Sequence, residues 1–306
     1  IDDFLPGFME DSYVDVKIYS IPFQRSTMVL YYNKDAFKEV GLDPEAPPTT
    51  WEELAEYGQK LTNDGRYGVG IALNSGSAQW AFTGFCLQNS TDGQNLMSED
   101  GKSVYFNTPE NVEALQFWLD LQNEYKCMAE GIVQWTDLPT QFLAGEVAMI
   151  YHTTGNMANI HDNADFDFGT AFLPAHKRVG APTGGGNFYI SSNISEDRVQ
   201  AAWKFIKFAT STDRAAQWSL DTGYVATRQS CFDTDLIKDY YAEVPQASVA
   251  YEQLPYAKPE LTTYNAAEIW RVLNDNIQAA VVGDMSAQEA LDAAQEQAEE
   301  VLSEYQ

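Results

Sequence analysis

Residues that cap helices, each followed by apolar residues at helical spacing, recur along the chain. Thr50-Trp51-Glu52-Glu53 is a capping box, and Thr108 is followed by a proline at the first helical position. The pattern predicts helices from Thr50 to about Leu61, from Thr108 onward, from Ser195 through Ala209, from Thr212 to Gly223, and from Ala287 to about Glu304 after the cap Ser286.

Short apolar or alternating runs bounded by turn residues lie between these helices and predict strands. The runs are Met28–Tyr32, Tyr67–Leu73, Val147–Tyr151, Phe166–Phe172 and Phe188–Ile190. Asp100-Gly101, between Leu96 and Val104, has the composition of a hairpin turn. Strands interleaved with helices indicate an α/β architecture.

The segment from Ile21 to Asp35 combines a polar stretch with a buried strand. Gln24–Thr27 is predicted to be a turn-prone loop that leads into the strand Met28–Tyr32, and a helix begins near Asn33. The arrangement places hydroxyl and amide donors at the mouth of a sheet, where small polar ligands commonly bind.

The composition describes a large and strongly acidic chain. It has 306 residues, 44% of them hydrophobic, and should form about two domains with a sizeable core. Its 45 acidic and 18 basic residues give a net charge of −27. Such a surface repels nucleic acid and anionic lipid, so neither is an expected partner. The acids are spread along the chain and predict no metal site.

The three cysteines, Cys86, Cys127 and Cys231, allow at most one disulfide and match no zinc spacing. Buried or half-buried free thiols are expected. No apolar run is long enough to span a bilayer, and no signal peptide is present. The first residue is Ile1, which indicates a processed or truncated chain and leaves the destination of its precursor open.

Motifs for catalysis are weak. The histidines His152, His161 and His176 form no zinc-binding pattern. The glycines 184–186 suggest a phosphate loop but lack the ending of a Walker motif; a close backbone crossing between domains within 180–187 explains them as well. With so many acids, no single carboxylate pair identifies a glycosidase. The chain is expected to be no enzyme and to need no cofactor.

Six passages resemble, in the right order, the solute-binding proteins of bacterial ABC importers. The nearest group binds glycerol-3-phosphate and related sugars or phosphodiesters. The passages are 21–35, 41–54 (GLDPEAPPTTWEEL), 142–156 (FLAGEVAM and TTGN), 184–187 (GGGN), 202–205 (AWKF) and 222–228 (TGYVATR).

The resemblance implies a two-lobe α/β fold of the periplasmic-binding-protein type (type II), with a hinge near 26–29 and 185–189. Residues 1–28 and 188–223 would be the remnant of an N-terminal lobe, and residues 29–187 and 224–306 the C-terminal lobe. Family members carry a further segment before the position of Ile1, so the N-terminal lobe is expected to be incomplete. The helices after Ser195 and Thr212 would then lack part of their partner, and this chain alone would bind ligand weakly or not at all.

The implied function is capture of a small solute, a sugar or a glycerol-3-phosphate-type molecule, and its delivery to a membrane permease. The implied location is outside the cytoplasm, either in a periplasm or lipid-anchored. A carbohydrate-active enzyme, or a receptor that reuses the same fold, remains the alternative.

By resemblance, ligand contacts are expected from Gln24, Arg25, Ser26, Trp80, Thr154, Gly155, Gly185, Tyr224 and Arg271. Trp80 would stack on a sugar face, although a core aromatic explains it too. Arg271 would bind a phosphate bidentately, although an internal salt bridge explains it too. The loop 75–79 lacks a second tryptophan found in some glycerol-phosphate binders, so the two ligand classes stay open.

Overall fold

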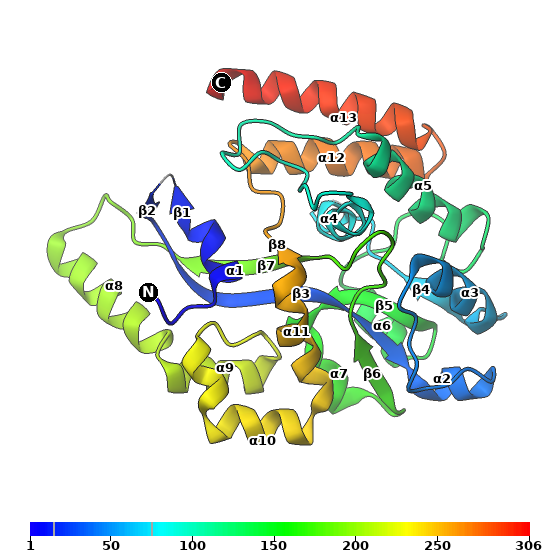
Figure 1. The fold of residues 1–306 in the computed structure, drawn as a ribbon, viewed down its shortest axis with the longest axis horizontal. Coiled ribbons are helices and arrows are strands. Elements are labelled where there is room, and N and C mark those ends of the chain that lie inside the picture. The colour runs from blue at the N-terminus through cyan, green and yellow to red at the C-terminus, as the bar shows by residue number, and fades with distance from the viewer. Residues whose placement is uncertain (15, 75) are drawn as a thin grey trace.

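The computed structural model describes residues 1–14, 16–74 and 76–306 of this α/β protein (Figure 1). Its strands are β1 (Tyr13–Val14), β2 (Lys17–Ile18), β3 (Ile21–Asn33), β4 (Tyr67–Gly70), β5 (Val147–Thr153), β6 (Phe168–Ala171), β7 (Ala181–Phe188) and β8 (Ala257–Lys258). Its α-helices are α1 (Pro6–Met9), α2 (Lys34–Glu39), α3 (Trp51–Leu61), α4 (Ala78–Asn89), α5 (Pro109–Asn123), α6 (Leu138–Leu143), α7 (Met157–Asn163), α8 (Glu196–Ala209), α9 (Thr212–Thr222), α10 (Asp235–Glu243), α11 (Ser248–Gln253), α12 (Ala266–Val281) and α13 (Ala287–Leu302).

The long strand β3 organises the main sheet, whose order is β4-β5-β3-β7-β8 with β6 also paired to β3. Its first half, 21–27, pairs antiparallel with β7, and its second half pairs antiparallel with β5 and β6. Alternation along β3 sends Met28 and Leu30 to one hydrophobic cluster and Val29 and Tyr31 to another. One strand therefore contributes to the cores on both faces of the sheet.

The prediction of a loop over Gln24–Thr27 was wrong, because these residues continue β3. The side chains of Gln24, Arg25 and Thr27 find partners inside the protein rather than in water. The Thr27 hydroxyl donates to the Pro182 carbonyl at 2.9 Å, and Arg25 forms an ion pair with Asp11. Polar groups in a buried strand are tolerated when they are hydrogen-bonded.

The predicted capped helices formed at the expected places as α3, α5, α8, α9 and α13. The Thr50 and Thr108 side chains accept the expected cap hydrogen bonds, and Ser286 forms a complete capping box with Glu289. Helix α4 was not predicted. All of its residues are buried, so it shows no polar face and no amphipathic period. The strand predicted over Phe188–Ile190 is instead the end of β7, at Phe188.

Helices cover both faces of the sheet. Helices α4, α5, α12 and α13 stack over one face, and α6, α7, α9 and α10 lie toward the other (Figure 1). All three cysteines are buried free thiols, as expected. Among the described residues, no helix combines the length and the apolar content that crossing a bilayer requires.

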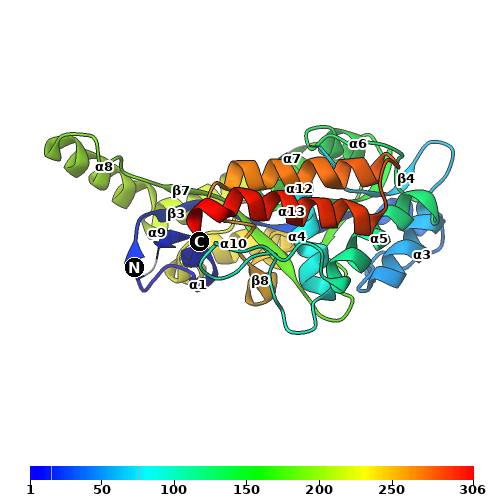
Figure 2. The same cartoon turned by 90° about the horizontal axis from the view of Figure 1, so that it is seen from above.

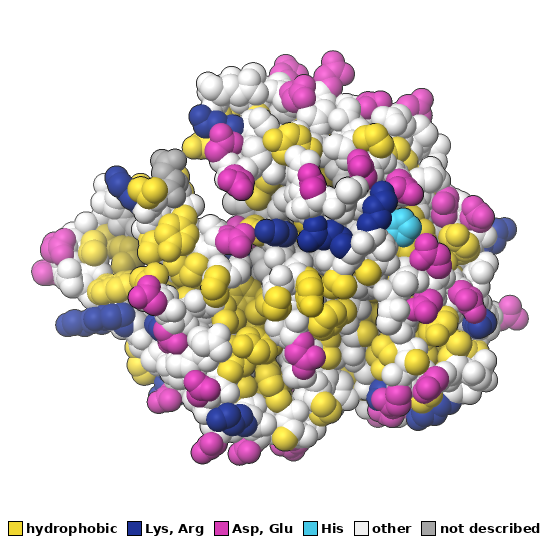
Figure 3. All heavy atoms as spheres, in the orientation of Figure 1, with side chains coloured by type: hydrophobic (Ala, Val, Ile, Leu, Met, Phe, Trp, Pro, Cys, Tyr) yellow, Lys and Arg dark blue, Asp and Glu magenta, His cyan; other side chains and the backbone are white. Residues whose placement is uncertain are grey.

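Helix α8 projects away from the rest of the molecule (Figure 2). Of its residues only Ile206 is buried, while Trp203, Phe205 and Phe208 are 37%, 57% and 57% exposed. Hydrophobic side chains gather on the part of the surface over α8 and α1, and acidic side chains spread around the outline (Figure 3). The expectation that the helix after Ser195 lacks part of its partner agrees with this exposure. Helix α9, in contrast, packs Ala215 and Ala216 into a small core.

Strands β3 and β7 run together from the part that carries α1, β1, β2 and α8 into the part that carries α2 to α7 (Figure 1). This is the course expected of hinge segments. The division of residues between an N-terminal remnant and a C-terminal lobe stays a prediction.

Gly185, opposite Arg25 in the β3–β7 ladder, provides a test of this crossing. Its φ is +107°, and a Cβ there would lie 1.9 Å from the Gln24 carbonyl oxygen. Gly185→Ala is expected to lower the free energy of unfolding by about 1–3 kcal/mol. An alanine would be strained at this positive φ, and its Cβ would also clash with the Gln24 carbonyl oxygen. The adjacent Gly186→Ala, where a Cβ meets nothing within 4 Å, is the matched control. Equal urea midpoints for the two variants would contradict the account.

Candidate functional site

A pocket of about 400 Å³ opens where β3 and β7 meet the N-terminal end of α4 and the segment that leads into α12. Its wall is formed by Ser26, Asn74, Gly76, Ser77, Gln79, Trp80, Trp135, Thr136, Thr153, Gly184, Gly185, Tyr224, Glu260 and Trp270. Ser26, Trp80, Gly185 and Tyr224 were expected from the sequence. Ser75 lies outside the described residues.

Three tryptophans give the pocket rigid aromatic surfaces. The Trp80 indole N–H donates to the Thr183 carbonyl at 2.9 Å, and the Trp270 indole N–H donates to the Leu261 carbonyl at 2.5 Å. Trp135 lies at a ring-centroid distance of 5.6 Å from Trp80 and stacks on His152 at 3.9 Å. Trp80 is 8% exposed, so only part of its ring borders the pocket. Trp80 is thus both a core residue and a wall residue.

Gly184 and Gly185 let the sheet approach these groups closely. A Cβ at Gly184 would lie 2.8 Å from the Trp80 ring. The glycines therefore act as a close backbone crossing within β7, which decides between the two interpretations of this stretch in favour of the crossing.

Hydroxyl groups of β3 and of the segment after α9 supply donors. The Gln24 amide donates to the Tyr224 hydroxyl at 2.6 Å, which leaves the Tyr224 O–H proton for another acceptor. The Ser26 hydroxyl makes no hydrogen bond within the described part of the chain. Gln24 is not itself on the wall. It acts through Tyr224.

Helix α12 fixes the opposite side through residues that the sequence did not single out. The Asn274 side-chain oxygen accepts from the Gln79 backbone N–H at 2.8 Å, and the Gln278 amide donates to the Leu73 carbonyl at 2.9 Å. These bonds hold the start of α4 against α12, between Trp80 and Trp270. Amide side chains on an amphipathic helix are common, so the sequence alone does not single out these two residues.

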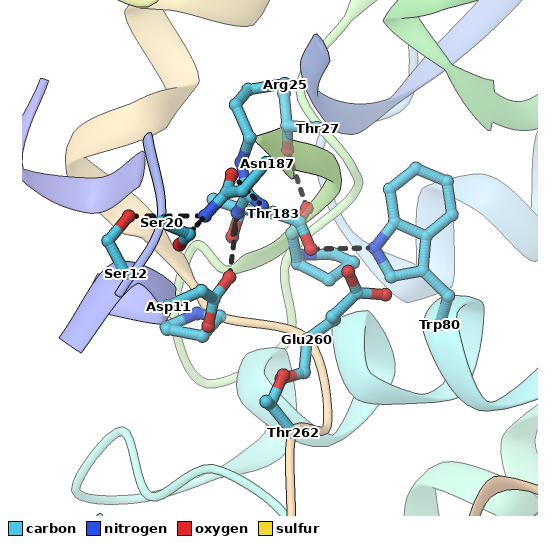
Figure 4. Close-up of polar contacts among 12 residues, drawn as sticks. Asp11, Ser12, Ser20, Arg25, Thr27, Trp80, Thr183, Asn187, Glu260 and Thr262 are labelled. Carbon is cyan, nitrogen blue, oxygen red and sulfur yellow. Dashed lines mark hydrogen bonds and ion pairs between the residues drawn. The ribbon is translucent and has the colours of Figure 1, made fainter. Parts of the chain in front are cut away.

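Arg25, which the resemblance predicts to contact the ligand, does not lie on the wall of this pocket. It is 2% exposed, and its guanidinium forms a 2.8 Å ion pair with Asp11 (Figure 4). The same guanidinium donates to Thr183 and Asn187 at 3.5 and 3.4 Å. The Arg25 side chain therefore links Asp11, which precedes β1, to the main sheet. It does not reach the pocket.

Thr154, Gly155 and Arg271 also lie off the wall. Thr154 is buried, with 1% exposure, and Gly155 supports the Tyr224 ring, against which a Cβ would clash at 2.5 Å. The Arg271 guanidinium pairs with Glu268 at 2.6 Å and Asp275 at 2.7 Å on its own helix. Its side chain is 54% exposed. The salt-bridge interpretation describes it.

Glu260, like Trp135 and Trp270, is a wall residue that sequence reasoning missed, because nothing distinguishes it among 45 acids. Its carboxylate points into the space between the Trp80 indole and the Arg25–Asp11 pair (Figure 4). Burial raises the pKa of the Glu260 carboxyl to about 7; Arg25 lowers this pKa and Asp11 raises it. The carboxylate oxygens accept no hydrogen bond within the described residues.

The pocket wall combines indole rings with hydroxyl, amide and carboxylate groups. Among the described residues, no group of His, Cys, Asp and Glu is placed to hold a metal ion. Burial lowers the pKa of His152, behind Trp135, to about 4, so its ring is neutral near pH 7. Stacking surfaces with hydroxyl, amide and carboxylate groups suit a small hydroxylated solute.

Comparison with known proteins assigns the family. The model of the bacterial extracellular solute-binding proteins matches residues 1–246. The chain belongs to this family. It is 31% identical to the sn-glycerol-3-phosphate-binding periplasmic protein UgpB of Salmonella paratyphi A, over 96% of this chain and 70% of that protein. It is 30% identical to the UgpB of Escherichia coli K12, over 98% of this chain and 70% of that protein.

Solved structures of the family share the fold. UgpB from Mycobacterium tuberculosis in complex with glycerophosphocholine superposes with a TM-score of 0.88 at 26% identity, over 99% of this chain and 75% of that one. The cyclic alpha-maltosyl-1,6-maltose binding protein of Arthrobacter globiformis gives 0.84 at 26%, over 99% and 77%. The predicted family and its two-lobe binding-protein fold are confirmed, and the family's members act outside the cytoplasm.

The buried Arg25–Asp11 pair should support the fold beside the pocket. Asp11→Ala is expected to lower the free energy of unfolding by roughly 3 kcal/mol, because it leaves a buried guanidinium without its carboxylate. Asp275→Ala, which breaks an exposed pair, is the control and should leave stability almost unchanged. Urea denaturation measures both. A loss no larger for Asp11→Ala than for Asp275→Ala would refute the structural role.

Glu260 should make stability depend on pH. Its folded pKa of about 7 lies above the ordinary value of 4.5, so between these pH values the folded protein keeps a proton that the unfolded chain releases. The contribution is complete below about pH 4.5 and is lost as the pH rises through 7. Urea unfolding at pH 5, 6, 7 and 8 should therefore show the wild type losing stability relative to Glu260→Gln. Parallel profiles would count against the raised pKa.

Proposed function

We propose that this protein captures a small hydroxylated solute, a sugar or a glycerol-phosphate-type molecule, in the tryptophan-lined pocket and delivers it unaltered to an ABC permease. The observation that carries the proposal is the pocket wall itself, where Trp80, Trp135 and Trp270 surround hydroxyl and amide groups. The apolar faces of a sugar or glycerol stack on indoles, while their rims need hydrogen bonds.

Ser26, Trp80, Gly185 and Tyr224 are the proposed ligand contacts, with Gln24 and Gly155 positioning the Tyr224 ring. Arg25 and Thr154 support the wall from behind. Relatives support the solute class: UgpB proteins are named for glycerol-3-phosphate, and two structural neighbours are bound to glycerophosphocholine or named for a cyclic maltose derivative.

We also propose that the protein performs no chemistry on its ligand. The support is that its relatives are solute-binding proteins. Capture, closure of the two lobes and release would then be the whole cycle. Recovery of each bound solute unchanged after prolonged incubation supports this, and any product would favour the carbohydrate-active enzyme instead.

Trp80→Ala tests the assigned pocket. The variant should weaken binding of any solute that raises the melting temperature of the full-length protein, at a cost of about 1–3 kcal/mol, because a stacking surface is removed. Trp203→Ala, on exposed helix α8, is the matched control and should bind like the wild type. Titration calorimetry measures both affinities, and melting of the ligand-free variants checks that they are folded. Unchanged affinity in Trp80→Ala would place the solute elsewhere.

A further inference from the structure

The wall of the pocket carries a charge opposite to the one that a phosphate ligand requires. Among its lining residues, Glu260 is the charged side chain, and neither lysine nor arginine is present. A phosphate monoester has close to two negative charges above neutral pH. Proteins that bind such groups direct arginines, lysines or helix N-termini at them.

Two arginines near the pocket, Arg25 and Arg271, could in principle supply the positive charge that a phosphate needs. Neither lies on the pocket wall. Arg25 is buried behind the wall and committed to Asp11 at 2.8 Å. Arg271 is held between Glu268 and Asp275 on the outer side of α12, which raises the pKa of its guanidinium. Both guanidinium groups already face carboxylates, whose negative charge offsets much of their attraction for a phosphate.

The wall instead carries a carboxylate without a hydrogen-bond partner. Glu260 is half-buried, and its carboxylate oxygens accept no hydrogen bond within the described residues. Such an acceptor gains from a hydrogen-bond donor on the ligand. Sugar and polyol hydroxyls are such donors, and phosphate oxygens are not.

We propose that Glu260 makes the pocket selective for uncharged polyhydroxylated solutes over phosphate monoesters, by accepting hydroxyl donors from the former and repelling the latter. This rests on the proposed function and narrows its two solute classes to one. It separates the chain from the relatives named for glycerol-3-phosphate, with which it shares about a third of its residues. Glu260 contacts the solute directly and is therefore a specificity-determining residue.

The test compares glycerol-3-phosphate with maltose, D-tagatose and ribitol as uncharged probes, by titration calorimetry on the full-length protein. At pH 8, Glu260→Gln should bind glycerol-3-phosphate at least about tenfold more tightly than the wild type, because the repelling charge is gone. At pH 5.5 the gain in glycerol-3-phosphate affinity should shrink, because the wild-type Glu260 carboxyl is then mostly protonated. Arg25 lowers the pKa of this carboxyl and Asp11 raises it. Glu260→Ala should weaken the binding of whichever uncharged probe the wild type binds.

Glu296→Gln is the matched control, because it removes the same charge from exposed α13 without altering the wall. It should leave the affinity of every probe unchanged, as should Arg271→Ala. A glycerol-3-phosphate affinity that does not improve in Glu260→Gln would overturn the proposal while leaving capture of an uncharged probe intact. Binding of none of the probes by the wild type would overturn the proposed function itself, so the two failures are distinguishable.

Discussion

The pairing of β3 with three other strands is the constraint on which the pocket depends. The first half of this strand is held by β7, and its second half is held by β5 and β6. Ser26 reaches the pocket from the point where the neighbours change, opposite Gly184 and beside Trp80. The β3–β7 pairing and the Trp80–Thr183 hydrogen bond place the hydroxyl, the glycine backbone and the indole side by side. Such preorganisation reduces the entropy lost on binding.

Much of the fold followed from local chemistry. The caps at Thr50, Thr108 and Ser286 set helix starts correctly, because a side-chain oxygen that satisfies free backbone N–H groups acts within a few residues. What failed depended on tertiary contacts. The polar residues 24–27 resemble a loop until Asp11 and Pro182 are seen to satisfy Arg25 and Thr27. Helix α4 is hidden from pattern analysis because it is buried all round.

The candidate site was predicted in part for the same reason. Resemblance identified Trp80, Ser26, Gly185 and Tyr224, which the sheet and its crossings bring together. It could not show that Arg271 turns outward to two acids on its own helix, since that depends on the rotation of α12 against α4. Nor could it distinguish Glu260, whose importance comes from its place on the wall with the indoles rather than from any motif. A shared fold fixes where a solute binds, whereas a few wall residues decide which solute binds.

A ligand-bound crystal structure of the full-length protein tests the central claim most directly. The account predicts that an uncharged polyol or sugar will lie in the pocket with its apolar face on an indole of Trp80 or Trp270 and a hydroxyl on Glu260. A solute bound away from these residues, or a phosphate group contacting a freed Arg25 or Arg271, would contradict it.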